Sequence, residues 1–156
     1  MTIRQATPSD IDTIMPLYDQ ARQRMRAAGN LMQWTDGYPQ RDLILSDIAR
    51  GVSFLCLQGG QVAAVFALIA GDDPTYNVIE GAWLNDRPYA TIHRIASRDG
   101  VHGILHEVLR WAQGLTDNLR IDTHEDNALM LHLLEREGFH YCGVIYVANG
   151  TPRRAF

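Results

Sequence analysis

Cysteine is scarce in this chain, in which Cys56 and Cys142 are the only two among 156 residues. Each lies inside an apolar, strand-like run, so we expect two small buried side chains rather than a disulfide, as suits a reducing cytoplasm. Long apolar runs are absent too: none approaches the ~20 residues of a membrane span, and Met1 to Gln5 lacks the apolar core of a signal peptide. The sequence predicts a cytoplasmic protein with no membrane partner.

An excess of positive charge is also missing. Lysine and arginine together number 14, against 18 aspartates and glutamates, which gives a formal net charge of −4. This balance argues against a general nucleic-acid binder, which needs a basic surface for the phosphates. Internal repeats, low-complexity tracts and linkers are absent as well, so we expect a single domain over residues 1–156.

The most informative stretch is a predicted strand, a glycine turn and a predicted helix in succession. Residues 91–97 are rich in β-branched and apolar side chains, and Gly100 and Gly103 mark the turn. Apolar residues then recur with helical spacing, at Ile104, Leu105, Val108, Leu109 and Ala112. The first amides of such a helix have no partner inside it, so the turn favours an anion. Gly103 could equally serve only to make the connection tight.

A second predicted strand and helix follow. Residues 119–123 have the pattern of a short strand, and Asp126 or Asn127 can cap a helix over residues 128–137. Gly138 suits the left-handed position that ends a helix.

These features together resemble the GNAT superfamily of acyl-CoA-dependent N-acetyltransferases. The matching residues are the opening segment 3–10, the strand segment 92–96, the turn and helix after it, Asn127, and the pair Gly138-Phe139. Together they extend the resemblance over the whole chain. It implies acetyl-CoA as co-substrate and a primary amine, in a small molecule or a peptide, as acceptor. The net negative charge does not oppose a CoA ligand, because a phosphate site can be built from local backbone.

Two positions depart from the superfamily's pattern. Its pyrophosphate turn usually reads Gln/Arg-x-x-Gly-x-Gly/Ala; aligned on Gly103, this chain has Gly100 in the basic position and Leu105 in the second glycine position. The tyrosine that usually stands four residues before the closing glycine of the last helix is replaced by Leu134.

The rest of the chain supplies further elements. A strand over residues 2–6 precedes a helix in which Pro16 predicts a kink or a break near Met15, and a second, short helix begins after Pro39. Gly59-Gly60 predicts a hairpin, residues 76–80 a strand, and Asn149-Gly150 a type I′ turn in a final hairpin. The order β-α-α-β-β-β-β-α-β-α-β-β predicts an α/β fold (α+β in some schemes) with a central mixed sheet and helices on both faces.

The resemblance assigns candidate binding residues. Backbone amides of a central strand that separates from its neighbour would polarise the thioester carbonyl; a continuous ladder without an opening is the alternative. The predicted acetyl-CoA contacts are Ile95, Ala96, Ser97, Gly100, Val101, His102, Gly103, Ile104, Leu105 and Asn127. Trp34 and Tyr38, two aromatics in an otherwise polar loop, are predicted to contact the substrate, or else to form a small packed cluster.

The proton-transfer residues are less defined by pattern. Glu80 ends a predicted apolar strand and His93 lies within the central strand, so either could be the general base. His93 could instead be a satisfied core histidine. Tyr141 and Tyr146 are candidate acids in place of the missing tyrosine, and Tyr146 is the one we assign.

Two other functions stay open. One is a non-catalytic acyl-CoA-binding or partner-binding domain of the same fold. The other is a metal-dependent hydrolase built on His102, His106 and Glu107, although the order is not His-Glu-x-x-His and we assign no metal. The terminal hairpin could pair with a second copy of the chain, so a homodimer is possible.

Overall fold

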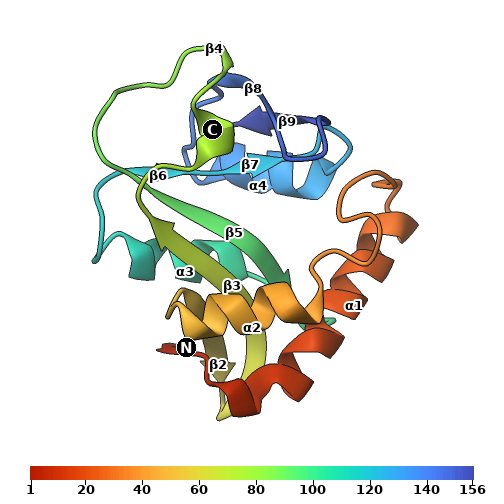
Figure 1. Ribbon diagram of the computed structural model, residues 1–156. Helices are drawn as coiled ribbons and strands as arrows, with labels where there is room; N and C mark the ends of the chain where they lie inside the picture. The colour runs from red at the N-terminus through yellow and green to blue at the C-terminus, as the bar shows by residue number, and fades with distance from the viewer.

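The computed structural model describes all residues, 1–156, and shows two sheets flanked by helices (Figure 1). The helices are η1 (Pro8–Asp10), α1 (Ile11–Ala27), α2 (Arg41–Ala49), η2 (Pro74–Tyr76), α3 (Ile104–Ala112) and α4 (Ala128–Arg136). The strands are β1 (Thr2–Gln5), β2 (Ser53–Gln58), β3 (Gln61–Ala70), β4 (Glu80–Gly81), β5 (Ala90–Ser97), β6 (Leu119–Arg120), β7 (Asp122–Thr123), β8 (Gly143–Tyr146) and β9 (Pro152–Ala155). Their order along the chain confirms the predicted α/β succession.

The central sheet has the order β1-β2-β3-β5-β6 and is antiparallel except at its last pair, β5 with β6. A second sheet has the order β4-β8-β9-β7. The mixed sheet is therefore confirmed. β6 and β7 form a short bridge between the two sheets, because only Ile121 separates them and its N–H and C=O pair with Phe156.

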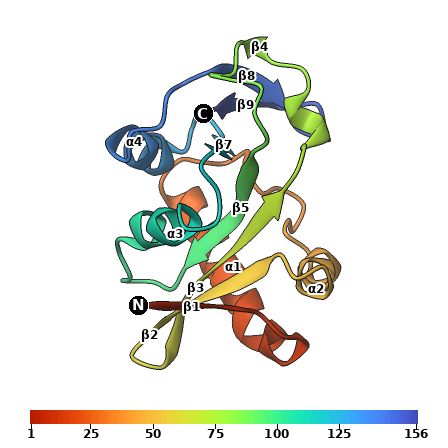
Figure 2. The same ribbon diagram turned by 90° about the vertical axis from the view of Figure 1, so that its left-hand side faces the viewer.

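Helices cover both faces of the central sheet, as predicted (Figure 2). On one face, apolar residues of α1 and α2 pack against Leu55, Val65 and Ala96. On the other, α3 and Leu134 of α4 pack against Cys56, Phe66 and their neighbours. Alternation along β2 and β3 sends successive side chains to opposite faces, which is how one strand serves both clusters. Both cysteines are buried and unpaired, which confirms the expectation drawn from their context.

Several local predictions are confirmed. Gly59 and Gly60 both have positive φ in the β2–β3 turn, and Gly138 has φ +86 directly after α4. Asn127 caps α4, its side-chain oxygen accepting from the Met130 amide. None of the helices combines the length and apolar character that crossing a bilayer requires.

Two local predictions are wrong, and a third is wrong in one of its alternatives. Of the kink or break expected near Met15, the break does not occur: α1 continues through Pro16 to Ala27, and Ile14, Leu17 and Tyr18 are buried on either side of the proline. Residues 76–80 do not form a strand, since Asp73 caps the turn η2 by accepting from the Thr75 amide. The last hairpin does not have a type I′ turn, because Gly150 alone has positive φ there and a three-residue loop connects Val147 to Thr151.

Candidate active site

A cleft of about 560 Å³ opens where the two sheets separate. β5 pairs with β6 at only two positions, Ala90 with Leu119 and Thr91 with Arg120. After that the chain leaves β5, and β7 pairs with β9 of the second sheet. From Ile92 onward, β5 therefore has no strand partner on this side. The predicted separation of the central strand is confirmed, and the alternative of a continuous ladder is wrong.

A bulge in β5 shapes the floor of this cleft. His93 lies opposite Ala67 and Ala96 lies opposite Val65, so β5 places two residues, Arg94 and Ile95, against Phe66 alone. Four consecutive residues of β5, 92–95, line the cleft, which a regular strand with alternating faces could not do.

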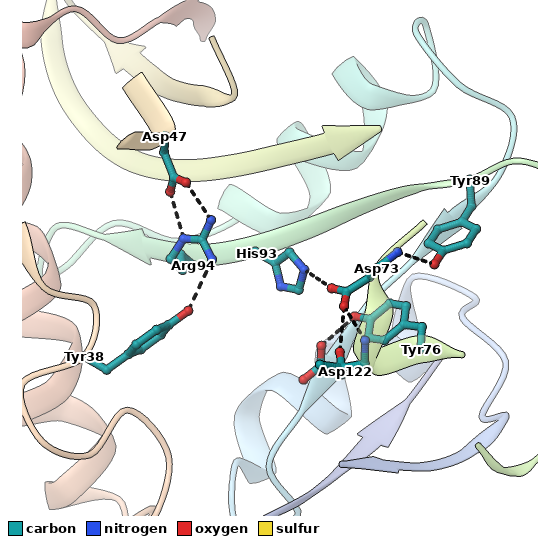
Figure 3. Close-up of polar contacts among 9 residues, drawn as sticks. Tyr38, Asp47, Asp73, Tyr76, Tyr89, His93, Arg94 and Asp122 are labelled. Atoms are coloured by element: carbon teal, nitrogen blue, oxygen red, sulfur yellow. Dashed lines mark hydrogen bonds and ion pairs between the residues drawn. The ribbon is translucent and has the colours of Figure 1, made fainter. Parts of the chain in front are cut away.

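Arg94 is the residue on which the bulge depends. Its φ of 50° lies in the left-handed region, which is costly for a residue with a side chain. The Tyr18 hydroxyl donates to its carbonyl at 2.8 Å. Its guanidinium donates to both carboxylate oxygens of Asp47, each at 2.9 Å, and to the Tyr38 hydroxyl at 3.2 Å (Figure 3). Backbone and side chain are thus both anchored to α1, α2 and the loop between them.

His93, the residue before Arg94, is held by a carboxylate. Its Nε2 lies 2.9 Å from Oδ2 of Asp73, and both side chains are about one-fifth exposed, at 21% and 19% (Figure 3). The other oxygen of Asp73 accepts from the Thr75 amide and hydroxyl, at 2.9 and 2.7 Å. The hydrogen bond with His93 lowers the pKa of Asp73 to about 2, with the Thr75 bonds acting in the same direction. Asp73 is therefore an ionised acceptor at neutral pH.

A second carboxylate, Asp122 of β7, faces the same region of the cleft. It accepts from the Tyr76 hydroxyl at 2.5 Å. Burial raises the pKa of Asp122, whereas the charges of His93 and Arg153 lower it. Asp122 thus lies within electrostatic reach of both side chains, and Figure 3 shows it beside the His93–Asp73 pair.

Trp34 and Tyr38 line the same cleft from the loop after α1. The Trp34 ring packs edge-on against Tyr18 at 5.6 Å and lies 6.3 Å from the Tyr38 ring. Trp34 and Tyr38 therefore form a packed aromatic cluster and also line the cleft. Asn127 also lines the cleft, and its amide donates to Gln33 of this loop at 3.2 Å.

The glycine turn lies beyond the carboxyl end of β5. Gly100 and Gly103 both have positive φ, 80° and 78°, and Gly103 is the N-cap of α3. The amides of Gly100, His102 and Gly103 donate to no group of the protein, and those of the first turn of α3 have no partner inside the helix. Leu105 is buried in the core beneath α3, so its side chain does not face the predicted anion site.

Glu80 and Tyr146 lie elsewhere. Both are exposed, and the Tyr146 hydroxyl donates to Glu80 at 3.0 Å. Neither residue lines the cleft that contains His93. Tyr141 is half-exposed and packs against Phe156. The structure therefore does not bring Glu80 and His93 together.

The three residues considered for a metal site are on the surface of α3 and its turn. His106 pairs with Glu137 at 3.1 Å rather than with His102. No group of three His, Cys, Asp or Glu side chains is placed to hold a metal ion.

Sequence reasoning missed Asp73, Asp122 and Arg153. Asp73 stands directly before a proline, which is typical of a cap. This pattern could have indicated that Asp73 is more than a residue of an ordinary turn. Arg153 could have been found from the alternation of the last strand. For Asp122, within a two-residue strand, we find no comparable signal.

No protein-family model matches the chain, and no curated protein does either. Solved structures do. A GNAT-family acetyltransferase from Streptococcus agalactiae 2603 is 36% identical over 99% of this chain and 92% of its own, with a TM-score of 0.88. Two more distant structures share the fold. One is a GNAT-family acetyltransferase from Listeria monocytogenes 4b F2365, which is 22% identical over 99% of this chain and 93% of its own, with a TM-score of 0.69. The other is a protein from Staphylococcus aureus Mu50 described as an acetyltransferase, which is 18% identical over 100% of this chain and 98% of its own, with a TM-score of 0.72. At 36% identity over almost its full length, the chain belongs to the GNAT family of acetyltransferases.

Proposed function

We propose that this chain transfers acetyl from acetyl-CoA to a primary amine by direct attack, with His93 as the general base. The observation that carries the proposal is the His93–Asp73 pair, which faces the cleft beside the unpaired edge of β5. A base, an open strand edge and a helix N-terminus then follow one another along a single segment of chain. This is the order in which the amine, the thioester and the phosphates would lie.

The residues present fit acetyl-CoA. The free amides of Gly100, His102 and Gly103, with those of the first turn of α3, would hold the pyrophosphate. The unpaired edge of β5 would hydrogen-bond the pantetheine arm as an added strand would. Amides in the segment Ile95–Ser97 would donate to the thioester carbonyl and stabilise the charge that develops on its oxygen.

Asp73 determines which nitrogen of His93 can act as the base. Because Asp73 is ionised, a neutral imidazole carries its proton on Nε2 and donates it to the carboxylate. Nδ1 keeps its lone pair and can accept the proton of the attacking amine. As the new C–N bond forms and the C–S bond breaks, the electron pair of that bond leaves with sulfur.

The leaving group and the thiols of the chain are consistent with this route. Leu134 cannot protonate a thiolate, but a thiol with a pKa near ~8.5, like that of free cysteine, can leave with electrostatic help alone. Cys56 is fully buried, which raises the pKa of its thiol to about 12, and Cys142 is buried as well. Neither lines the cleft, which supports the proposal of direct transfer without an acyl intermediate on cysteine.

The experiment is a panel of primary amines with acetyl-CoA, followed by free-thiol release and by the mass of each acetylated product. The chain has no lysine, and both thiols are buried, so background from the protein itself is small. Thiol release that requires an amine and yields its N-acetyl form is expected. Acetyl-CoA binding without turnover of any amine would instead support the non-catalytic binding domain.

A further inference from the structure

We infer that Arg153 is a carboxylate-binding residue in the cleft, which makes the acceptor an amine that also carries a carboxylate, such as an amino acid. This inference rests on the proposed function, since it names the class of amine that His93 would deprotonate. Four observations carry it.

The first is the direction of the side chain. In β9, residues alternate between exposed and buried: Arg153 and Ala155 are buried, whereas Pro152 and Arg154 are exposed. Arg154 pairs with Glu125 on the outer surface, at 3.8 Å. Arg153 lines the cleft, together with Val147, Ala148 and Asn149 of the hairpin loop. The strand therefore places one of two adjacent arginines inside the site.

The second is that Arg153 has unused donors. Its Nη1 donates to the Thr151 hydroxyl at 3.1 Å and to the Pro152 carbonyl at 2.8 Å. Nε and Nη2 donate to no group of the protein. Neither is among the fully buried polar atoms that lack a hydrogen bond, so both are accessible. Because Arg153 lines the cleft, these accessible donors can bind a ligand there, in the planar arrangement that matches a carboxylate.

The third is that no carboxylate of the protein forms an ion pair or a hydrogen bond with Arg153. It is 7% exposed, and an arginine this buried is ordinarily paired. Arg94, the other largely buried guanidinium of the cleft, is fully engaged by Asp47. Asp122, whose charge acts on Arg153, accepts from the Tyr76 hydroxyl instead, and burial raises the pKa of Asp122. Burial lowers the pKa of Arg153, and the charge of Asp122 offsets this only in part.

The fourth is the position of Arg153 relative to the base. His93, Asp122 and Arg153 all line the same cleft. One molecule bound in that cleft could therefore present its amine to His93 and its carboxylate to Arg153. Asp122 could accept from the ammonium of the arriving acceptor.

The test compares L-amino acids with the matching L-amino-acid amides as acceptors, with rates expressed per unprotonated amine. The enzymes are wild type, Arg153→Gln, Arg153→Lys and, as a matched control, Arg154→Gln. Wild type is expected to favour the acids by about 10- to 100-fold in kcat/KM, the range of a charge-assisted pair. Arg153→Gln should lose that preference through acceptor KM, keep its KM for acetyl-CoA and its rate with amides, and Arg153→Lys should retain part of it. Arg154→Gln should match wild type.

A binding measurement separates this inference from the proposed function. N-acetylglycine and N-acetylglycinamide are titrated into each protein, and the thermal shift is recorded. Wild type, but not Arg153→Gln, should be stabilised more by the acid than by the amide, whether or not any amine is turned over. Equal stabilisation of wild type by both probes, or a preference that survives Arg153→Gln in a folded protein, would overturn the inference. Absence of turnover with a preserved acid preference would refute the acetyltransferase proposal alone.

Discussion

Asp73 lies 2.9 Å from His93 through Oδ2, while Thr75 holds its other oxygen twice. The carboxylate is thus fixed by its own turn, η2, before it contacts the imidazole. A base held this way has Nε2 engaged by Asp73, while Nδ1 has no hydrogen-bond partner in the protein. The relationship joins the β3–β4 connection to the central strand, across 20 positions of sequence.

Replacing Asp73 by Asn should slow the reaction without weakening cofactor binding. An amide can offer its N–H to His93 and stabilise the wrong tautomer, so Nδ1 would no longer be the free base. We expect kcat to fall toward loss of the whole general-base contribution, ~10²–10⁴-fold, with KM for acetyl-CoA unchanged. Steady-state kinetics beside Asp72→Asn, the exposed neighbour, measure this. Equal, small losses in both variants would contradict it.

The Asp73 carboxylate should also make the free energy of unfolding depend on pH in the acid range. The pKa of Asp73 is lowered from 3.8 to about 2, so its stabilisation is complete above pH 4 and is lost as the pH falls toward 2. At ~1.4 kcal/mol per pH unit, the loss is roughly 2 kcal/mol. Urea unfolding between pH 6 and pH 2 should show Asp73→Asn less stable than wild type at pH 6 and converging with it near pH 2. A gap independent of pH would be inconsistent with the ion pair.

The buried pair of Arg94 and Asp47 should be worth more to stability than surface pairs. Asp47 is 1% exposed, so Asp47→Ala leaves the Arg94 guanidinium buried without a counter-charge. We expect a loss of ~3–5 kcal/mol in the free energy of unfolding. The control is Asp12→Ala, which breaks the exposed pair with Arg41 and should cost less than ~1 kcal/mol. Similar small losses in both would show that the bulge does not depend on this pair.

The glycine turn gives a prediction about the cofactor. Gly103→Glu places a negative charge where the phosphates would lie and should weaken acetyl-CoA binding strongly, whereas Gly103→Ala carries only the strain of φ 78°. Leu105→Gly should not tighten binding, because Leu105 is packed in the core; it should instead cost ~1 kcal/mol for helical glycine plus the lost packing. Calorimetry of the three variants tests this. Wild-type affinity in Gly103→Glu would remove the site.

Local chemistry made much of the fold predictable. Asn127 as a helix cap, Gly138 after the same helix and the Gly59-Gly60 hairpin each depend on neighbours a few residues away. The turn type predicted at Asn149-Gly150 is wrong because the loop length, which the pairing of Val147 with Thr151 sets, outweighs the Asn-Gly signal.

The site was only partly predictable, because its partners come from distant segments. His93, Trp34, Tyr38 and Asn127 do line one cleft. Glu80 was chosen as the end of an apolar run, but that run is a capped turn followed by a two-residue strand, which leaves Glu80 exposed with Tyr146. The acid beside His93 comes from a turn that no periodicity marks.

The most direct measurement is the pH dependence of kcat/KM for an accepted amine in wild type, His93→Gln and Glu80→Gln. If His93 is the base, wild type should level off once the base is deprotonated. His93→Gln should be slower by ~10²–10⁴-fold and keep rising to the pKa of the amine itself, and Glu80→Gln should follow wild type. A wild-type profile in His93→Gln, with the levelling lost in Glu80→Gln, would contradict the account.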